Sequence, residues 1–280
     1  MRKSDNERNR RPSNNKGGNF KKKPFNKGGS KPFKSAPKKT NSNPDLIRLN
    51  KYIANAGICS RREADTFITA GNVTVNGKPV TELGYKVKKS DDVRFDGRRL
   101  NPEKKEYVLL NKPKNFITTT SDDKGRRTVM ELVSSASKNR LYPVGRLDRN
   151  TTGLLLFTND GELAKKLTHP KHNVRKIYHV HLDKALTMRD LQQIMEGLTL
   201  EDGPITVDEV SYVQGATKKE VGIEIHSGKN RIVRRIFEHL GYTVVKLDRV
   251  VFAGLTKKDL PRGHWRFLTE QEVINLGMIR

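Results

Sequence analysis

The chain has 280 residues, of which 56 are Lys or Arg and 31 are Asp or Glu. It has a single cysteine, Cys59, which excludes an intramolecular disulfide and a zinc site made of several cysteines. No uninterrupted apolar run exceeds four residues, far fewer than the roughly 20 that a membrane-spanning helix needs, so we expect no membrane segment. No apolar segment of a secretory signal follows the basic N-terminus, and the sequence therefore indicates a cytoplasmic protein.

The positive charge is concentrated near the N-terminus. Residues 1–44 carry 14 basic and 2 acidic side chains, a net +12, which leaves +13 of the total +25 for the rest of the chain. This segment has too few apolar side chains to offset the entropy lost on ordering, so we predict a disordered basic tail over residues 1–45. The excess of basic residues indicates a polyanionic partner, most often a nucleic acid; a solvated basic surface is the alternative.

A small module is predicted over residues 46–105. Apolar residues at helical spacing indicate its first helix, and a capping box formed by Ser60 and Glu63 begins the second. An Asn-Gly turn indicates a hairpin. The predicted elements are a helix over 46–56, a helix over 60–71, a strand over 73–75 that enters the turn, and a strand over 93–95.

Two arginines lie in the first turn of the second predicted helix, where the helix dipole disfavours cations. Arg61 and Arg62 would form a phosphate-binding cradle together with the free backbone amides of that turn. The alternative is that both side chains point into water at small cost.

Residues 106–280 are predicted to form a larger domain of class α+β, because strands and helices follow one another without regular alternation or repeats. The predicted strands cover 107–110, 154–157, 177–182 and 221–225, and predicted helices begin near Thr128, Thr187 and Thr269.

The segment 143–161 carries the strongest chemical signal. Asp148 lies between Arg146 and Arg149, just before a wholly apolar strand, and is a candidate active-site acid or nucleophile whose charged form is favoured. A surface aspartate in local ion pairs is the alternative. Motifs for nucleotide hydrolysis, dinucleotide binding and serine hydrolysis are absent from the sequence, and no metal site is expected.

This segment, GRLDRNTTGLLLFTNDGELA, closely resembles the catalytic motif of the bacterial ribosomal-RNA pseudouridine synthases of the RsuA/RluB class. Three other stretches agree with the family in order and spacing: NKPKNFITTTSDDKGRRTVMELV, RKIYHVHL and SGKNRIVRRIFEHLGY. The segment RLNKYIANAGICSRREADTFITAGNVTVNG resembles an S4-like RNA-binding domain. The resemblance spans residues 46–270, and GLTLEDGP is similar to the large-subunit RluB branch.

The resemblance implies a mainly antiparallel catalytic sheet behind an S4-like domain, and an enzyme that isomerises a uridine of ribosomal RNA, in the 23S molecule, to pseudouridine without a cofactor. Asp148 matches the family's nucleophile, Tyr178 its strand tyrosine, which packs against the uracil, and Arg234 the basic partner of the catalytic aspartate. Such an enzyme must first take the target base out of its stack.

Helix geometry agrees with the assignment of Arg234. At 100° per residue from Arg231, the apolar residues share one face, Arg231 and Arg235 lie on the opposite face, and Arg234 falls on the boundary. We therefore expect Arg234 to pair with Asp148; three solvated arginines are the alternative. The residues expected to contact RNA are Arg48, Lys51, Arg61, Arg62, Arg146, Lys229, Arg231 and Arg235.

The expected partner is ribosomal RNA or an assembling ribosomal subunit, bound by a monomer. The alternative from another class is a non-catalytic RNA-binding or ribosome-assembly factor of the same fold, against which the intact Asp148, Tyr178 and Arg234 argue. An S4-domain RNA methyltransferase is disfavoured because the sequence has no glycine-rich cofactor loop.

Overall fold

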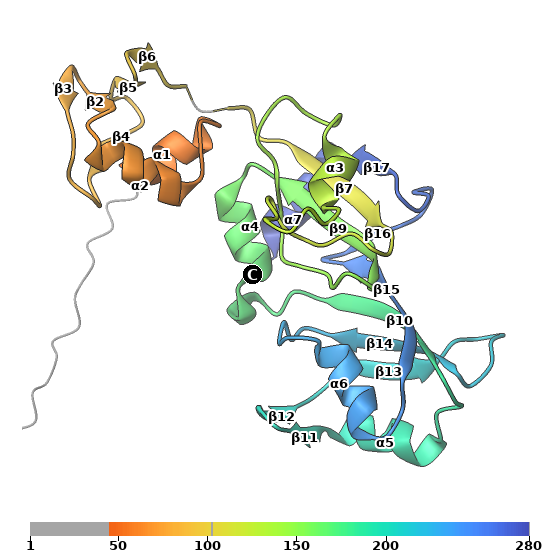
Figure 1. The fold of residues 1–280 in the computed structure, drawn as a ribbon. Coiled ribbons are helices and arrows are strands. Elements are labelled where there is room, and N and C mark those ends of the chain that lie inside the picture. The colour runs from red at the N-terminus through yellow and green to blue at the C-terminus, as the bar shows by residue number, and fades with distance from the viewer. Residues whose placement is uncertain (1–44, 102, 280) are drawn as a thin grey trace, which may run out of the picture. The chain divides into compact units, whose positions relative to one another are not determined.

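The computed structural model describes residues 45–101 and 103–279 (Figure 1). The predicted disordered tail therefore lies outside the described residues, apart from Asp45. The described elements are helices and mainly antiparallel strands, which confirms the α+β class. None of the helices within 45–101 and 103–279 is long and apolar enough to cross a membrane.

The N-terminal module holds two helices and two small sheets, one with the strand order β3-β2-β5-β6 and the other formed by β1 and β4. The capping box of Ser60 is present, since its side chain accepts a hydrogen bond from the backbone N–H of Glu63. The elements are β1 (Leu46–Arg48), α1 (Leu49–Asn55), α2 (Arg61–Thr69), β2 (Val73–Val75), β3 (Lys78–Pro79), β4 (Lys86–Lys88), β5 (Val93–Phe95) and β6 (Arg98–Arg99). Their inward apolar side chains form one core.

The prediction of this module was right at its turns and wrong at its start. Asn76 and Gly77 both have positive φ, 50° and 79°, as a tight two-residue hairpin requires. The helix predicted from Leu46 begins only at Leu49. Residues 46–48 form β1 instead, because they pair antiparallel with β4 about 40 residues later in the chain, a long-range contact that overrides local helical spacing.

The larger domain is built on a nine-stranded sheet with the order β13-β14-β10-β15-β9-β7-β17. Strand β8 pairs with β9, and β16 pairs with β15. The strands are β7 (Tyr107–Lys112), β8 (Tyr142–Pro143), β9 (Thr152–Thr158), β10 (Lys176–Leu182), β13 (Glu209–Tyr212), β14 (Glu220–Ile225), β15 (Val244–Phe252), β16 (Leu255–Thr256) and β17 (Trp265–Phe267). A separate two-stranded sheet joins β11 (Leu198–Leu200) and β12 (Gly203–Ile205).

All neighbouring strands of the large sheet are antiparallel except β9 and β15, which pair in parallel at Thr152 with Asp248 and at Gly153 with Arg249. We call this junction the seam. It divides the sheet into an N-terminal half, β8, β9, β7 and β17, and a C-terminal half, β13, β14, β10, β15 and β16.

Helices cover the sheet and build its core. The N-terminal half is buried on both faces: Leu154 and Leu156 pack in one cluster with residues of α4 and α7, while Leu155 and Phe157 pack in another with residues of α3. This explains why the apolar run in β9 does not alternate with polar residues. The helices of the domain are α3 (Val129–Val133), α4 (Gly161–Thr168), α5 (Met188–Glu196), α6 (Ile232–His239) and α7 (Glu270–Met278), with a 3-10 turn over Pro170–His172.

The predicted helix starts are confirmed where local caps define them. Thr187 and Thr269 accept hydrogen bonds from the backbone N–H three residues later, at the N-termini of α5 and α7. Helix α4 was not predicted as a helix, although Asp160 caps it by accepting hydrogen bonds from the N–H groups of Glu162 and Leu163.

Candidate active site

A pocket of about 450 Å³ lies across the seam and takes its lining from both halves of the sheet. Asp148 and Arg146 come from the loop that precedes β9, whereas Tyr178 comes from β10 and Arg231 from the N-terminus of α6. Lys229 lines the same pocket. The structure thus brings together most of the residues that the sequence indicated for catalysis.

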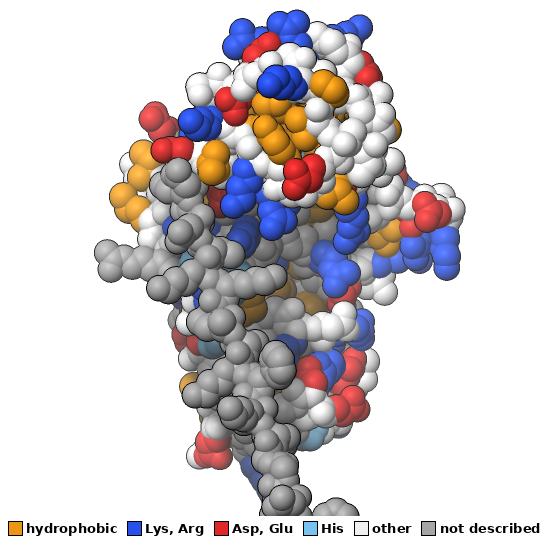
Figure 2. Space-filling view, turned by 90° about the vertical axis from the view of Figure 1, so that its left-hand side faces the viewer, with side chains coloured by type: hydrophobic (Ala, Val, Ile, Leu, Met, Phe, Trp, Pro, Cys, Tyr) orange, Lys and Arg blue, Asp and Glu red, His pale blue; other side chains and the backbone are white. Residues whose placement is uncertain are grey.

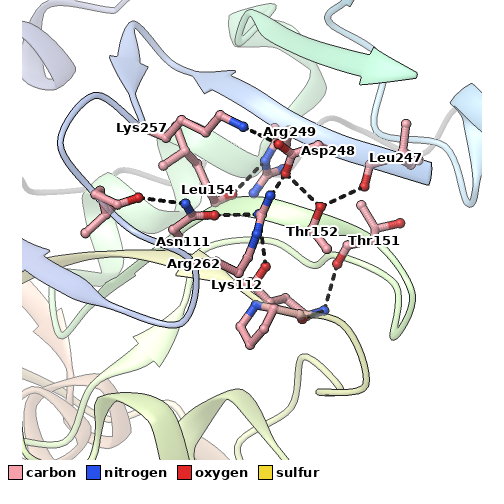
Figure 3. A network of polar contacts seen from close by, with 12 residues as sticks. Asn111, Lys112, Thr151, Thr152, Leu154, Leu247, Asp248, Arg249, Lys257 and Arg262 are labelled. Carbon is pink, nitrogen blue, oxygen red and sulfur yellow. Dashed lines mark hydrogen bonds and ion pairs between the residues drawn. The ribbon is translucent and has the colours of Figure 1, made fainter. Parts of the chain in front are cut away.

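The loop that carries Asp148 is held by a buried lysine. The side chain of Lys112, at the end of β7, is fully buried. Its ammonium donates hydrogen bonds to the carbonyl oxygens of Asp148 at 3.1 Å, Arg149 at 3.3 Å and Thr151 at 2.8 Å (Figure 3 draws the bond to Thr151). Burial lowers the pKa of Lys112 to about 8, and the negative charge of Asp148 opposes that shift.

Further hydrogen bonds fix the same loop on both sides of Asp148. The Thr118 hydroxyl donates to the carbonyl of Leu147 at 2.7 Å. The backbone N–H of Asn115 donates to the carbonyl of Arg149 at 2.9 Å, and that of Thr151 to the carbonyl of Asp148 at 3.1 Å. The backbone is therefore fixed, while the Asp148 side chain stays 37% exposed to the pocket.

The cation nearest to the Asp148 carboxylate is Arg231, and the expected pairing with Arg234 is corrected. Arg231 Nη1 lies 3.8 Å from Asp148 Oδ2, and no ion pair among the described residues joins Arg234 to Asp148. The helix begins one residue later than predicted, at Ile232, so Arg231 is its N-cap with φ of +47° rather than part of the helical wheel.

Arg234 is instead buried, and it is not one of the residues that line the pocket. Its side chain is only 8% exposed, and Nη1 donates a hydrogen bond to the carbonyl of Val244 at 2.8 Å. Burial lowers the pKa of Arg234, the charge of Arg231 adds to that effect, and the negative charge of Asp148 opposes it. Arg234 therefore interacts with Asp148 electrostatically, at a distance, and makes no direct contact with it.

Two residues expected to face phosphates are held by an acidic partner. Arg235 makes a bidentate ion pair with Asp202, at 2.7 and 3.0 Å, and Lys229 lies 3.6 Å from the same carboxylate. Hydrogen bonds from Arg235 lower the pKa of Asp202 to about 2. RNA phosphates would have to compete with Asp202 for these two cations.

Tyr178 is half-buried, lines the pocket and packs against core clusters from both halves of the sheet. Lys176, two residues earlier on β10, shares its face and lines the same pocket. Lys176 donates to the carbonyl of His226 at 2.6 Å, and burial together with the charge of Arg249 lowers its pKa to about 8.

Arg249 was not singled out from the sequence, yet it is buried at the floor of the pocket. Its Nε donates to the carbonyl of Leu154 across the seam at 2.9 Å (Figure 3). Its guanidinium lies over the Phe252 ring, 4.4 Å from the ring centroid. Strand alternation from Tyr178 is the signal that could have found Lys176, because residues two apart on a strand share a face. No singled-out residue of β15 pointed to Arg249 in the same way. Lys112 gives no such signal, because it follows an apolar strand as an ordinary surface lysine would.

The residues expected to contact RNA in the N-terminal module lie at its surface. Arg48, Arg61 and Arg62 are exposed, with Arg61 and Arg62 in the first turn of α2 as predicted, and Lys51 is partly buried. Arg146 is exposed at the pocket. Figure 2 shows Lys and Arg side chains at several places on one face, with Asp and Glu side chains between them.

Comparisons with known proteins agree with this geometry. Residues 106–239 match the family model described as RNA pseudouridylate synthase, and residues 47–93 match the S4 domain. The chain is 43% identical over 234 residues to ribosomal large subunit pseudouridine synthase B of Bacillus subtilis (strain 168). This alignment covers 82% of this chain and 96% of that relative.

A second relative is the dual-specificity RNA pseudouridine synthase RluF of Escherichia coli (strain K12), 37% identical over 82% of this chain and 78% of its own length. A crystal structure of a pseudouridylate synthase matches 82% of this chain and 99% of that chain, with 30% identity and a TM-score of 0.59.

Proposed function

The chain belongs to the RNA pseudouridylate synthase family, and from that premise we propose that its substrate is a specific uridine of ribosomal RNA, in the 23S molecule. It is an RNA pseudouridine synthase and therefore an isomerase. The observation that carries the proposal is the position of Asp148, whose carboxylate is open to the pocket while its backbone is held by Lys112.

The reaction breaks the bond between the ribose C1′ and N1 of uracil, turns the base, and forms a bond between C1′ and C5. C5 loses its proton to a base or to water, and N1 gains one, so the atoms balance without an oxidant or a donor group. Asp148 attacks C1′ as a nucleophile or removes a sugar proton in the glycal route. Both roles need an ionised carboxylate beside an uncharged base.

Each of the other catalytic candidates has a role that its position supports. Tyr178 packs against the turning uracil and takes part in removal of the C5 proton. Arg231 is the cation beside the carboxylate at 3.8 Å, and Arg234 adds its positive charge without touching Asp148.

In this proposal, RNA binding is divided among three parts of the chain. The basic tail covers residues 1–45, the S4-like domain 46–105 and the catalytic domain 106–280. Phosphate contacts set the position of the RNA, and loop shape sets which uridine is presented. The proposed contacts are Arg48, Lys51, Arg61 and Arg62 in the S4-like domain, and Arg146, Lys229, Arg231 and Arg235 around the pocket. We propose that the enzyme acts as a monomer on ribosomal RNA or an assembling subunit.

The test measures tritium release from ribosomal RNA labelled at uracil C5, comparing wild type, Asp148→Asn and the exposed control Asp259→Asn. Wild type and Asp259→Asn should release tritium from large-subunit RNA. Asp148→Asn should be at least ~1,000-fold slower, because an amide is neither a nucleophile nor a base, with RNA affinity within about 3-fold of wild type.

Small-subunit RNA and unmodified ribosomal subunits are offered in parallel. Wild-type rates in Asp148→Asn would refute its assignment as the catalytic carboxylate. Tight binding with no release from any RNA or subunit would favour the non-catalytic RNA-binding factor over the enzyme.

A further inference from the structure

Five polar side chains meet at the seam outside the pocket that holds Asp148 (Figure 3). We call this group the seam cluster. It joins the ends of β7 and β9, the middle of β15, and the segment between β16 and β17. Its members are Asn111, Thr152, Asp248, Lys257 and Arg262.

Asp248 is the centre of the seam cluster and is 13% exposed. Its Oδ1 accepts hydrogen bonds from the Thr152 hydroxyl at 2.7 Å and from Arg262 Nη1 at 2.8 Å, and its Oδ2 accepts one from the Lys257 ammonium. Burial raises the pKa of this carboxyl, but the bonds from Arg262, Lys257 and Thr152 outweigh burial and lower it to about 2. The carboxylate is therefore ionised at neutral pH.

The seam cluster is linked to the loop of Asp148 on both sides. Thr152 directly follows Thr151, whose carbonyl accepts the 2.8 Å bond from the Lys112 ammonium. Arg262 Nη1 also donates to Asn111 Oδ1 at 2.6 Å and lies 3.4 Å from the carbonyl oxygen of Lys112. Lys112 and the loop that it holds are thus connected to Asp248 from either end (Figure 3).

This connection matters because the reacting groups come from different halves of the sheet. Asp148 belongs to the N-terminal half and Tyr178 to the C-terminal half, and the backbone pairing that joins the halves covers only two residues of each strand. Polar side-chain bonds across the seam add to this short pairing and to the apolar packing between the halves. A displacement of about 1 Å between reacting groups can cost 100-fold in rate.

We propose that Asp248 and Arg262 are positioning residues, which hold the Asp148 loop in register with the half of the sheet that carries Tyr178. They touch neither the pocket nor its reacting atoms. The proposal rests on the proposed function, in which Asp148 is the catalytic carboxylate.

The test compares Asp248→Asn with wild type under single-turnover conditions at saturating enzyme. We expect the rate of pseudouridine formation to fall about 10-fold or more, while the Kd for RNA changes less than about 2-fold. Amide hydrogen exchange is measured as well, because the N–H groups of Asn115 and Thr151 donate to the carbonyls of Arg149 and Asp148. Both amides should exchange faster in Asp248→Asn.

Arg262 provides the second pair of variants. Arg262→Ala should lower the rate as Asp248→Asn does, and Arg262→Lys should recover part of it, since an ammonium can bond Asp248 but cannot also span to Asn111. These variants keep the proposal testable if Asp248→Asn does not fold.

Glu272→Gln is the matched control. Glu272 makes a bidentate, partly buried ion pair with Arg266 at 2.8 and 2.6 Å and caps α7, away from the seam. Glu272→Gln should lose about as much thermal stability as Asp248→Asn. It should keep the wild-type rate, and the amides of Asn115 and Thr151 should stay as protected from hydrogen exchange as in wild type.

Three results would overturn the proposal: equal loss of rate in Glu272→Gln, unchanged exchange at Asn115 and Thr151 in Asp248→Asn, or a weakened Kd with an unchanged saturating rate. The last result would make the seam cluster an RNA contact. If wild type forms no pseudouridine at all, the proposed function fails, and the exchange measurement still decides whether Asp248 positions the loop.

Discussion

Lys112 shows how one buried charge can hold a loop in place beside a pocket. Burying a charged side chain without hydrogen-bond partners costs free energy. The buried Lys112 ammonium has such partners, because it donates hydrogen bonds to the carbonyl oxygens of Pro113, Asp148, Arg149 and Thr151. The carbonyl oxygens of the loop in turn accept hydrogen bonds from a protein side chain. The backbone around Asp148 is therefore fixed before any substrate arrives, as electrostatic preorganisation requires.

Replacing Lys112 by Met should leave these carbonyls without their donor. We expect Lys112→Met to lose about 3 kcal/mol of unfolding free energy, within the range for breaking a buried charged hydrogen-bond group. The single-turnover rate should fall further than that of Asp248→Asn, because the bond to the loop itself is lost. Denaturant unfolding and the tritium-release assay at a temperature where both proteins are folded measure the two effects.

The matched control is Lys219→Met. Lys219 also donates to a backbone carbonyl, that of Asp183 at 3.0 Å, but it does so at the surface, where water can replace the ammonium. This variant should stay within about 0.5 kcal/mol of wild type. Equal destabilisation by the two substitutions would contradict the role assigned to burial at Lys112.

At the scale of the strand, Gly153 makes the parallel seam possible. It has φ of +104°, and a Cβ there would lie 2.5 Å from the backbone nitrogen of Arg249 and closer still to its carbonyl oxygen. Any side chain would push β9 away from β15 at the pairing that joins the halves of the sheet. Both the backbone conformation and the close approach require glycine.

We expect Gly153→Ala to cost about 3 kcal/mol of stability through strain and strand separation, and to abolish most of the activity. Gly222→Ala is the control in the same sheet: its φ is not in the left-handed region, and an added Cβ would find its nearest neighbour at 3.9 Å. Thermal unfolding of both variants measures the difference. A Gly153→Ala protein as stable and active as Gly222→Ala would disprove the steric argument.

The elements that the sequence predicted correctly are those set by neighbours in the chain. The capping boxes and the Asn76-Gly77 turn depend on contacts within four residues. Residues 46–48 were assigned wrongly because their partner is β4, and the start of α6 was misplaced by one residue because Arg231 has a left-handed backbone. Arg231, at the N-cap, lies 3.8 Å from Asp148, whereas Arg234 is buried and donates to the carbonyl of Val244.

In the candidate site, too, features set by neighbouring residues in the chain were predicted, and those set by long-range contacts were not. Asp148 and Tyr178, which the resemblance to the pseudouridine synthase family singled out, both line the pocket. The seam cluster could not be predicted, because Thr152 and Asp248 are 96 residues apart and their strands pair at only two positions. No local pattern distinguishes Asp248 from an exposed strand residue until that register is known.

At the scale of the whole molecule, positive charge is divided between residues 1–44 and the rest of the chain. The described residues hold part of their positive charge in local ion pairs, such as that of Arg235 with Asp202. Residues 1–44, which lie outside the described residues, carry a net +12. Site selection and general affinity for RNA are therefore expected to depend on different parts of the chain.

Removing residues 1–44 should weaken binding to ribosomal RNA and flatten its dependence on salt, because each lost phosphate contact reduces the slope of log K against log salt by roughly 0.7 to 0.9. The loss should be largest at low salt and shrink as salt rises, and the modified uridine should not change. Affinity is measured between ~50 and ~200 mM salt, and the modified position is mapped on the same RNA. A tail of equal length with its 14 Lys and Arg residues replaced by Gln should behave like the deletion, since charge and not length supplies the affinity. A shifted modification site, or an unchanged salt slope, would contradict this division of roles.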